Sequence, residues 1–225
     1  MMPGPASPPA HFRRGATADR HQARRTATVL ELARGLCGRA LDYGSGWGDL
    51  TARLAPQFHE IVGVDADAER VEFARAEYAP LQFSLCAAER TDFEDQSFDV
   101  VCSIVVLPFV PSADRYLAEC RRLLRPGGTL VFMVPNPDSL RMMIRRWRGR
   151  PVHGRRWGGL TRAEVRAFLV RNGFRVEREG GFYDPAFEGV RNAGDVVLSL
   201  LSAVAHRLKL SGRWSYVGFR CQRLP

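Results

Sequence analysis

Lysine is almost absent from this 225-residue sequence: Lys209 is the only one, so arginine carries nearly all the positive charge behind the net charge of +9. Arginine suits the planar recognition of phosphate and carboxylate groups, which is compatible with an anionic partner. The sequence also lacks zinc-finger spacing and an aromatic RNA-binding strand. These absences do not favour a nucleic acid as that partner.

Paired cysteines and long apolar runs are missing as well. The five cysteines are widely spaced and form no Cys-x-x-Cys pair, which predicts buried free thiols in a reducing compartment and no metal site. No segment approaches the roughly twenty apolar residues that a membrane span needs, and the start has no signal-peptide core. We therefore expect a cytoplasmic protein with a disordered tail over residues 1–15 and a single domain over 16–225.

Short apolar segments alternate with amphipathic ones through the first 135 residues. The apolar segments predict buried strands at 39–43, 60–65, 81–86, 98–104 and 129–134. The segments between them predict helices at 17–36, 49–56 and 66–78, and a fourth that is capped by Ser112 and ended by residues 126–128. This alternation predicts an α/β fold in which a parallel sheet is covered on both faces and binds its ligand beyond the carboxyl ends of the strands.

The pattern changes after Pro135. Residues 139–160 are strongly basic and aromatic, and residues 161–172 predict a helix that starts with a Thr161-x-x-Glu164 capping box. Two further strands are expected at 174–182 and 215–222. The insertion between them, residues 185–213, contains an apolar helix candidate.

A glycine-rich turn, Leu41-Asp-Tyr-Gly-Ser-Gly-Trp-Gly48, follows the first predicted strand. Glycines let the backbone approach a ligand there, and Asp65 ends the second predicted strand, where a carboxylate can accept hydrogen bonds from both hydroxyls of a ribose. Dinucleotide-binding turns read G-x-G-x-x-G, whereas this turn reads G-x-G-x-G and has Asp42 before it. That anion favours a cationic or amino-bearing ligand over a pyrophosphate, although an NAD(P)-dependent oxidoreductase stays open as an alternative.

Together with Asp65, the pattern Asp42-x-Gly44-x-Gly46-x-Gly48 resembles the signature of class I S-adenosylmethionine-dependent methyltransferases, in particular the broad "type 11" small-molecule group. Residues 88–101, 119–128 and 161–174 resemble later motifs of the group, in the same order. The resemblance implies a Rossmann-like, doubly wound, mostly parallel seven-stranded sheet with helices on both faces. It also implies S-adenosyl-L-methionine as cofactor and methyl transfer to a small-molecule or lipid-like acceptor, mainly by in-line positioning.

The same resemblance implies a set of cofactor contacts at the carboxyl ends of the strands. The implied residues are Asp42, Gly44, Ser45, Gly46, Gly48, Asp65, Ala66, Ala88, Glu89, Ser103 and Ile104. Asp42 would face the amino group of the methionine part, and Asp65 would hold the ribose hydroxyls. Ala88 and Glu89 would border the adenine, and Ser103 would lie in the floor of the site.

The sequence departs from the group in the turn after the fourth strand. Many relatives have histidines there, whereas residues 106–110 read Val-Leu-Pro-Phe-Val. Candidates for a general base are His153, which could equally be a surface residue, Tyr43 and Tyr183. A protein that binds S-adenosylmethionine without catalysis is a second alternative.

Two segments bear on the acceptor and on partners. Residues 139–160 would recognise an anionic or lipid-like acceptor, rest on an anionic membrane surface, or form a solvated arginine-rich loop. The apolar residues within 185–213 would cap the substrate pocket, join the core or form a dimer face. Monomer and homodimer both stay open.

Overall fold

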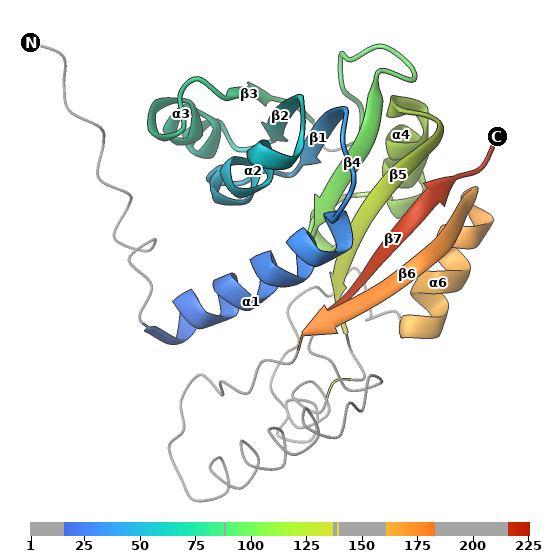
Figure 1. Ribbon diagram of the computed structural model, residues 1–225. Helices are drawn as coiled ribbons and strands as arrows, with labels where there is room; N and C mark the ends of the chain where they lie inside the picture. The colour runs from blue at the N-terminus through green and yellow to red at the C-terminus, as the bar shows by residue number, and fades with distance from the viewer. Residues whose placement is uncertain (1–15, 88, 137–138, 140–160, 183–215) are drawn as a thin grey trace, which may run out of the picture.

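The computed structural model describes residues 16–87, 89–136, 139, 161–182 and 216–225 (Figure 1). Seven strands form one sheet: β1 (Arg39–Tyr43), β2 (Glu60–Asp65), β3 (Gln82–Leu85), β4 (Phe98–Ile104), β5 (Leu124–Pro135), β6 (Phe174–Phe182) and β7 (Tyr216–Arg223). The α-helices are α1 (Ala16–Ala33), α2 (Asp49–Leu54), α3 (Ala68–Glu77), α4 (Ala113–Leu123) and α6 (Arg162–Arg171). Two short 3₁₀ helices, η2 (Ala55–Gln57) and η3 (Leu107–Phe109), follow α2 and β4.

The strand order is β3-β2-β1-β4-β5-β7-β6. Strands β1 to β5 pair in parallel, and β7 runs antiparallel to both β5 and β6. The order reverses direction between β1 and β4, which is the switch point where doubly wound sheets bind ligands.

Alternate residues of the central strands enter two different cores. On β4, Val101 packs in a core with α4 and α6, whereas Cys102 packs in a core with α1 and α2. This two-residue period is the geometry of a strand buried on both sides. Figure 1 shows the resulting three layers, with α1 and α2 on one side of the sheet and α4 and α6 on the other.

The predicted fold class and most predicted elements are confirmed. The strands at 39–43, 60–65 and 98–104 have the predicted bounds. Ser112 caps α4 by accepting a hydrogen bond from the Arg115 N–H, and Thr161 and Glu164 form the reciprocal capping box of α6.

Several boundaries differ from the prediction; helix α1, for example, ends at Ala33 rather than at residue 36. Helix α3 begins at Ala68 rather than at residue 66, because the Asp67 carboxylate accepts hydrogen bonds from the N–H groups of Glu69 and Arg70 and so caps the helix. Strand β5 begins at Leu124, before the Pro-Gly-Gly segment, because Leu124 already pairs with Phe98 and the register shifts before the next pair. The Pro-Gly-Gly segment therefore lies in an irregular part of a strand.

Several expectations concern residues outside the described part of the chain. These include Ala88, His153, Tyr183, nearly all of the basic segment 139–160 and the whole of the insertion 185–213. The domain bounds 1–15 and 16–225 likewise stay predictions. Among the described residues, no helix is long and apolar enough to span a membrane.

Candidate cofactor site

The glycine-rich turn is held against the end of β2. The N–H groups of Gly44 and Ser45 both donate to the Val64 carbonyl, at 2.8 and 2.9 Å. Gly44, Gly46 and Gly48 all have positive φ, at 87°, 55° and 85°. Such a backbone strongly favours glycine, since an L side chain collides with its own carbonyl there.

Asp65 connects this turn to the start of α3. Its carboxylate accepts hydrogen bonds from the N–H of Gly46 at 2.8 Å and from the N–H of Asp67 at 3.0 Å. The neighbouring Asp67 caps α3, so Asp65 is not used as that cap. Since a carboxylate offers about four lone-pair positions, Asp65 retains acceptor capacity for a ligand.

A cavity of about 710 Å³ opens at the carboxyl ends of β1, β2 and β4. Its volume is in the range of roughly 300–1,000 Å³ that small-molecule and cofactor sites have. It is lined by Gln22, Ala23, Arg25, Thr26, Tyr43, Gly44, Ser45, Gly46, Trp47, Asp49, Leu50, Arg53, Val64, Asp65, Ala66, Arg70, Cys86, Ile104, Val105, Val106, Phe109 and Val110.

The structure brings most of the predicted cofactor residues together and leaves the others outside the cavity lining. Those in the lining are Gly44, Ser45, Gly46, Asp65, Ala66 and Ile104, together with Tyr43. Those outside it are Asp42, Gly48, Glu89 and Ser103. Gly48 instead faces α3 and β3: a Cβ there would lie 2.9 Å from Ala74, Tyr78 and Phe83 side-chain atoms.

Ser103 and Glu89 have partners within the protein. The Ser103 hydroxyl accepts a hydrogen bond from the Tyr116 hydroxyl at 2.9 Å, and the Tyr116 ring lies 4.8 Å from that of Tyr43. Glu89 accepts a hydrogen bond from the Ser112 N–H at 2.6 Å. Both residues therefore support neighbours of the cavity, and their contact with a ligand stays a prediction.

Asp42 is 1% exposed and lies beneath the turn. Burial raises its pKa to about 6, while a 2.6 Å hydrogen bond from the Thr51 hydroxyl and the charge of Arg25 oppose that shift. Arg25 belongs to α1 and lines the cavity, so the charge that acts on Asp42 lies in the wall of the candidate site. A cation and an anion therefore lie near each other at this end of the site.

Tyr43 lines the cavity but is 2% exposed. Burial raises the pKa of its phenol, and the hydroxyl donates a hydrogen bond to the Ala87 carbonyl at 3.4 Å. A phenol that stays protonated can donate a hydrogen bond but is a poor proton acceptor at neutral pH. The geometry thus favours a donor role over the general-base role considered for Tyr43.

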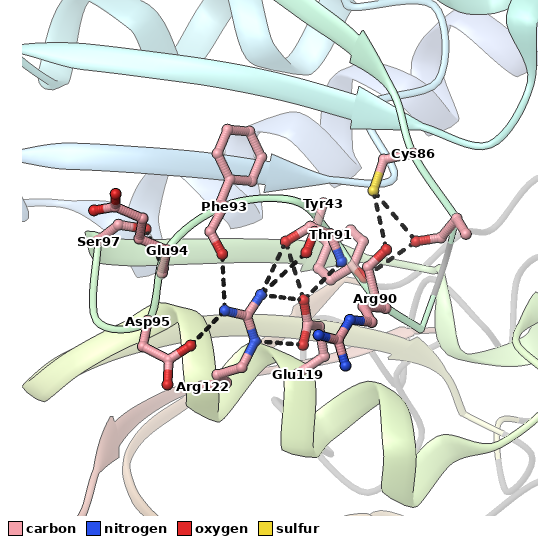
Figure 2. A network of polar contacts seen from close by, with 11 residues as sticks. Tyr43, Cys86, Arg90, Thr91, Phe93, Glu94, Asp95, Ser97, Glu119 and Arg122 are labelled. Carbon is pink, nitrogen blue, oxygen red and sulfur yellow. Dashed lines mark hydrogen bonds and ion pairs between the residues drawn. The ribbon is translucent and has the colours of Figure 1, made fainter.

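The loop after β3 is anchored to α4 by an ion pair between a buried carboxylate and a half-buried guanidinium group (Figure 2). Arg122 pairs with Glu119 at 2.7 Å and donates to the Phe93 carbonyl at 2.8 Å. Glu119 in turn accepts hydrogen bonds from the backbone and hydroxyl of Thr91, at 2.8 and 3.0 Å. At the start of the same loop, Cys86 lines the cavity and its thiol donates to the Arg90 carbonyl. The ion pair therefore fixes a loop that borders the site.

Sequence reasoning missed the contribution of α1 and of two arginines. Gln22, Arg25 and Thr26 line the cavity although they lie about twenty residues before the glycine turn. Arg53 and Arg70 also line it, from α2 and α3. An amphipathic helix pattern does not indicate which of its polar residues faces a ligand, so the sequence carried no signal for them.

The comparisons with known proteins agree with this geometry. Residues 41–132 match a family described as "Methyltransferase domain". The Ubiquinone biosynthesis O-methyltransferase of Roseobacter denitrificans is 34% identical over 161 residues, covering 65% of this chain and 64% of that protein. The Phthiotriol/phenolphthiotriol dimycocerosates methyltransferase 1 of Mycobacterium ulcerans is 31% identical over 150 residues, covering 65% and 53%. The match thus spans less than two thirds of each of these curated relatives.

A solved structure shares the fold. A chain from the complex between the Haloferax volcanii Trm112 methyltransferase activator and a methyltransferase superposes with a TM-score of 0.72 at 19% identity, covering 92% of both chains. The family match over residues 41–132 and these relatives support a class I S-adenosylmethionine-dependent methyltransferase, and the solved structure shows the same fold. Other matches are named as S-adenosylmethionine-dependent methyltransferases, which supports S-adenosylmethionine as the cofactor, and the NAD(P) alternative finds no support among these matches.

Proposed function

We propose that the chain transfers the methyl group of S-adenosylmethionine to a small-molecule or lipid-like acceptor at the cavity described above. The observation that carries the proposal is the position of Asp65, a carboxylate with spare acceptor capacity that is bonded to the glycine turn and lines the cavity. Relatives whose names refer to ubiquinone biosynthesis and to phthiotriol support a small or lipid-like acceptor.

Two features of the turn fit a bound nucleoside cofactor. A Cβ at Gly46 would meet no atom within 4 Å, so the backbone of the turn faces open space beside Asp65. The hydroxyl of Ser45 is buried and has no hydrogen-bond partner within the described chain. Buried polar groups are rarely left in this state, so a ligand atom would be a suitable partner if the Ser45 side chain turned from Gly63 toward the cavity.

The methionine part of the cofactor carries a carboxylate and an ammonium group. Arg25 would receive the carboxylate, because it lines the cavity and bears a fixed positive charge. Asp42 would stabilise the ammonium group through water or after a small rearrangement, since it is a buried carboxylate two residues before Gly44 and lies outside the cavity lining. Asp65 would hold the ribose at the other side of the turn.

When bound, the cofactor supplies a methyl group that its sulfonium has already activated. The chain's own residues then have to hold the two reactants in line. The entropy lost in bringing two reactants together and orienting them is a large part of the barrier to a bimolecular step. The glycine turn between β1 and α2 and the apolar segment after β4 both line the cavity and can do so. The basic segment 139–160, nearly all of which lies outside the described residues, supports an acceptor that is anionic or lipid-like.

Replacing Asp65 tests the site. In Asp65→Asn the side chain is nearly isosteric but uncharged, and we expect the Kd for S-adenosylhomocysteine to rise at least about tenfold, which corresponds to 1.4 kcal/mol. The matched control is Asp67→Asn, which alters a neighbouring carboxylate outside the cavity lining. Calorimetry should show near-normal binding for the control, and equal affinities for both variants and the wild type would refute the assignment of Asp65.

A further inference from the structure

The segment that follows β4 has an unusual backbone. Val105 has a φ of 63°, a conformation that β-branched residues rarely adopt and that costs of the order of 1–3 kcal/mol. Its N–H donates to the Met133 carbonyl at 2.8 Å, so the pairing with β5 holds the strained residue in place. Strain that persists at the edge of a cavity is a reason to look for a role.

The consequence of this turn is the placement of Val106 and Phe109. A Cβ built at Gly44 would lie 2.3 Å from Cγ2 of Val106, so Val106 packs directly against the glycine turn. Val105, Val106, Phe109 and Val110 together line one side of the cavity with apolar side chains.

Phe109 is 81% exposed although it belongs to the cavity lining. Among the described residues it is the most exposed of the large apolar side chains, and the next two, Leu85 and Val170, lie outside the cavity. Leu107 and Val110, on either side of it, are 1% exposed, so the segment is firmly anchored while the Phe109 ring is not buried. An aromatic ring left in water at the mouth of a cavity gains free energy when a ligand covers it.

The cavity lining also contains charged side chains, those of Asp65, Arg25 and Arg70. We infer that Phe109 and Val106 form the acceptor face of the cavity and that the acceptor presents a planar apolar group, such as an aromatic ring, to the Phe109 side chain. This inference rests on the proposed function, because it assumes that the cofactor occupies the part of the cavity lined by these charged side chains.

The test uses the full-length chain saturated with S-adenosylhomocysteine and the uncharged fluorophore N-phenyl-1-naphthylamine, whose emission rises in an apolar site. We expect saturable binding to the loaded wild type and a Kd that rises about tenfold in Phe109→Ala, because the aromatic contact is lost. Phe109→Trp keeps an aromatic face and should restore binding. Leu85→Ala, at 57% exposure and outside the cavity, is the matched control and should bind like the wild type.

Each outcome decides the matter. The absence of saturable binding to the loaded wild type, or equal affinities for Phe109→Ala and Leu85→Ala, would overturn the inference. Calorimetry on the same samples distinguishes failure of this inference from failure of the proposed function. If the wild type does not bind S-adenosylhomocysteine, the proposed function is contradicted. If it binds S-adenosylhomocysteine normally but Phe109→Ala leaves the affinity for the fluorophore unchanged, only the acceptor face is contradicted. Unfolding curves should be unchanged for Phe109→Ala because the side chain is exposed.

Discussion

Gly46 and Gly35 offer a matched pair of substitutions that separates backbone strain from cofactor contact. Both have positive φ, at 55° and 75°, and at both a Cβ would meet no atom within 4 Å. Gly46 lies in the cavity lining, whereas Gly35 follows α1 outside it. A change to alanine therefore imposes the same kind of strain at the two positions, and only one of them faces the proposed cofactor.

The expected stability cost is similar for Gly46→Ala and Gly35→Ala, about 1–2 kcal/mol each, because an alanine must adopt the left-handed conformation. For a chain of this size, that corresponds to a fall in Tm of roughly 2–4 °C per kcal/mol. The added methyl group at Gly46 also enters the space beside Asp65, so the Kd for S-adenosylhomocysteine should rise at least about tenfold, or 1.4 kcal/mol.

The assays are thermal unfolding without ligand and calorimetric titration with S-adenosylhomocysteine at a temperature where both variants are folded. Gly35→Ala should bind like the wild type despite its lower Tm. If Gly46→Ala binds as tightly as Gly35→Ala, the open space above the turn is not the cofactor site, and the reasoning from the turn geometry fails.

Two further predictions concern the strained turn and Asp42. At Val105 we expect the glycine variant to be more stable than the alanine variant by about 1 kcal/mol, because glycine tolerates positive φ. At Val106, whose φ is −88°, the alanine variant should be the more stable one. Chemical denaturation that gives the same order of stability at both sites would contradict the assignment of strain to Val105. Burial raises the pKa of Asp42 to about 6, and a bound ammonium group favours the ionised carboxylate. The affinity for S-adenosylhomocysteine should therefore fall by up to about tenfold per pH unit below pH 6 and level off above pH 6. Calorimetric titrations at several pH values should show that the Asp42→Asn variant lacks this dependence.

The sheet could be predicted because its signals are local. A short apolar segment bounded by glycine or aspartate already specifies a buried parallel strand, and a period of two or 3.6 residues separates strand from helix. The start of β5 was missed because Leu124 enters the strand before the Pro-Gly-Gly segment, which reads as a stop. The pairing of Leu124 with Phe98 is a long-range contact, which local sequence does not encode.

The meeting of the glycine turn and Asp65 at the cavity could be predicted for a related reason. The glycines of the turn and Asp65 lie directly after two strands, and parallel topology brings such positions to one edge of the sheet. Arg25 could not be predicted, because only the packing of α1 beside α2 brings it to the cavity. The strain at Val105 was equally hidden, since valine is an ordinary strand residue and its positive φ accompanies a hydrogen bond to Met133, 28 residues later in the chain.

The segment Glu119-x-x-Arg122 shows how a motif can be noticed before its physical reason is known. In sequence it resembles a family pattern on a helix that precedes β5. In the structure the two side chains form an ion pair that also holds Thr91 and the Phe93 carbonyl, which lie 28 and 29 residues earlier in the chain than their partners (Figure 2). Glu119 is 6% exposed, so removing Arg122 alone would leave a buried charge without its partner, which is more costly than losing an exposed pair. The pair thus links α4 to the loop that begins at Cys86, and the shape of the cavity depends on a contact made beyond its own lining.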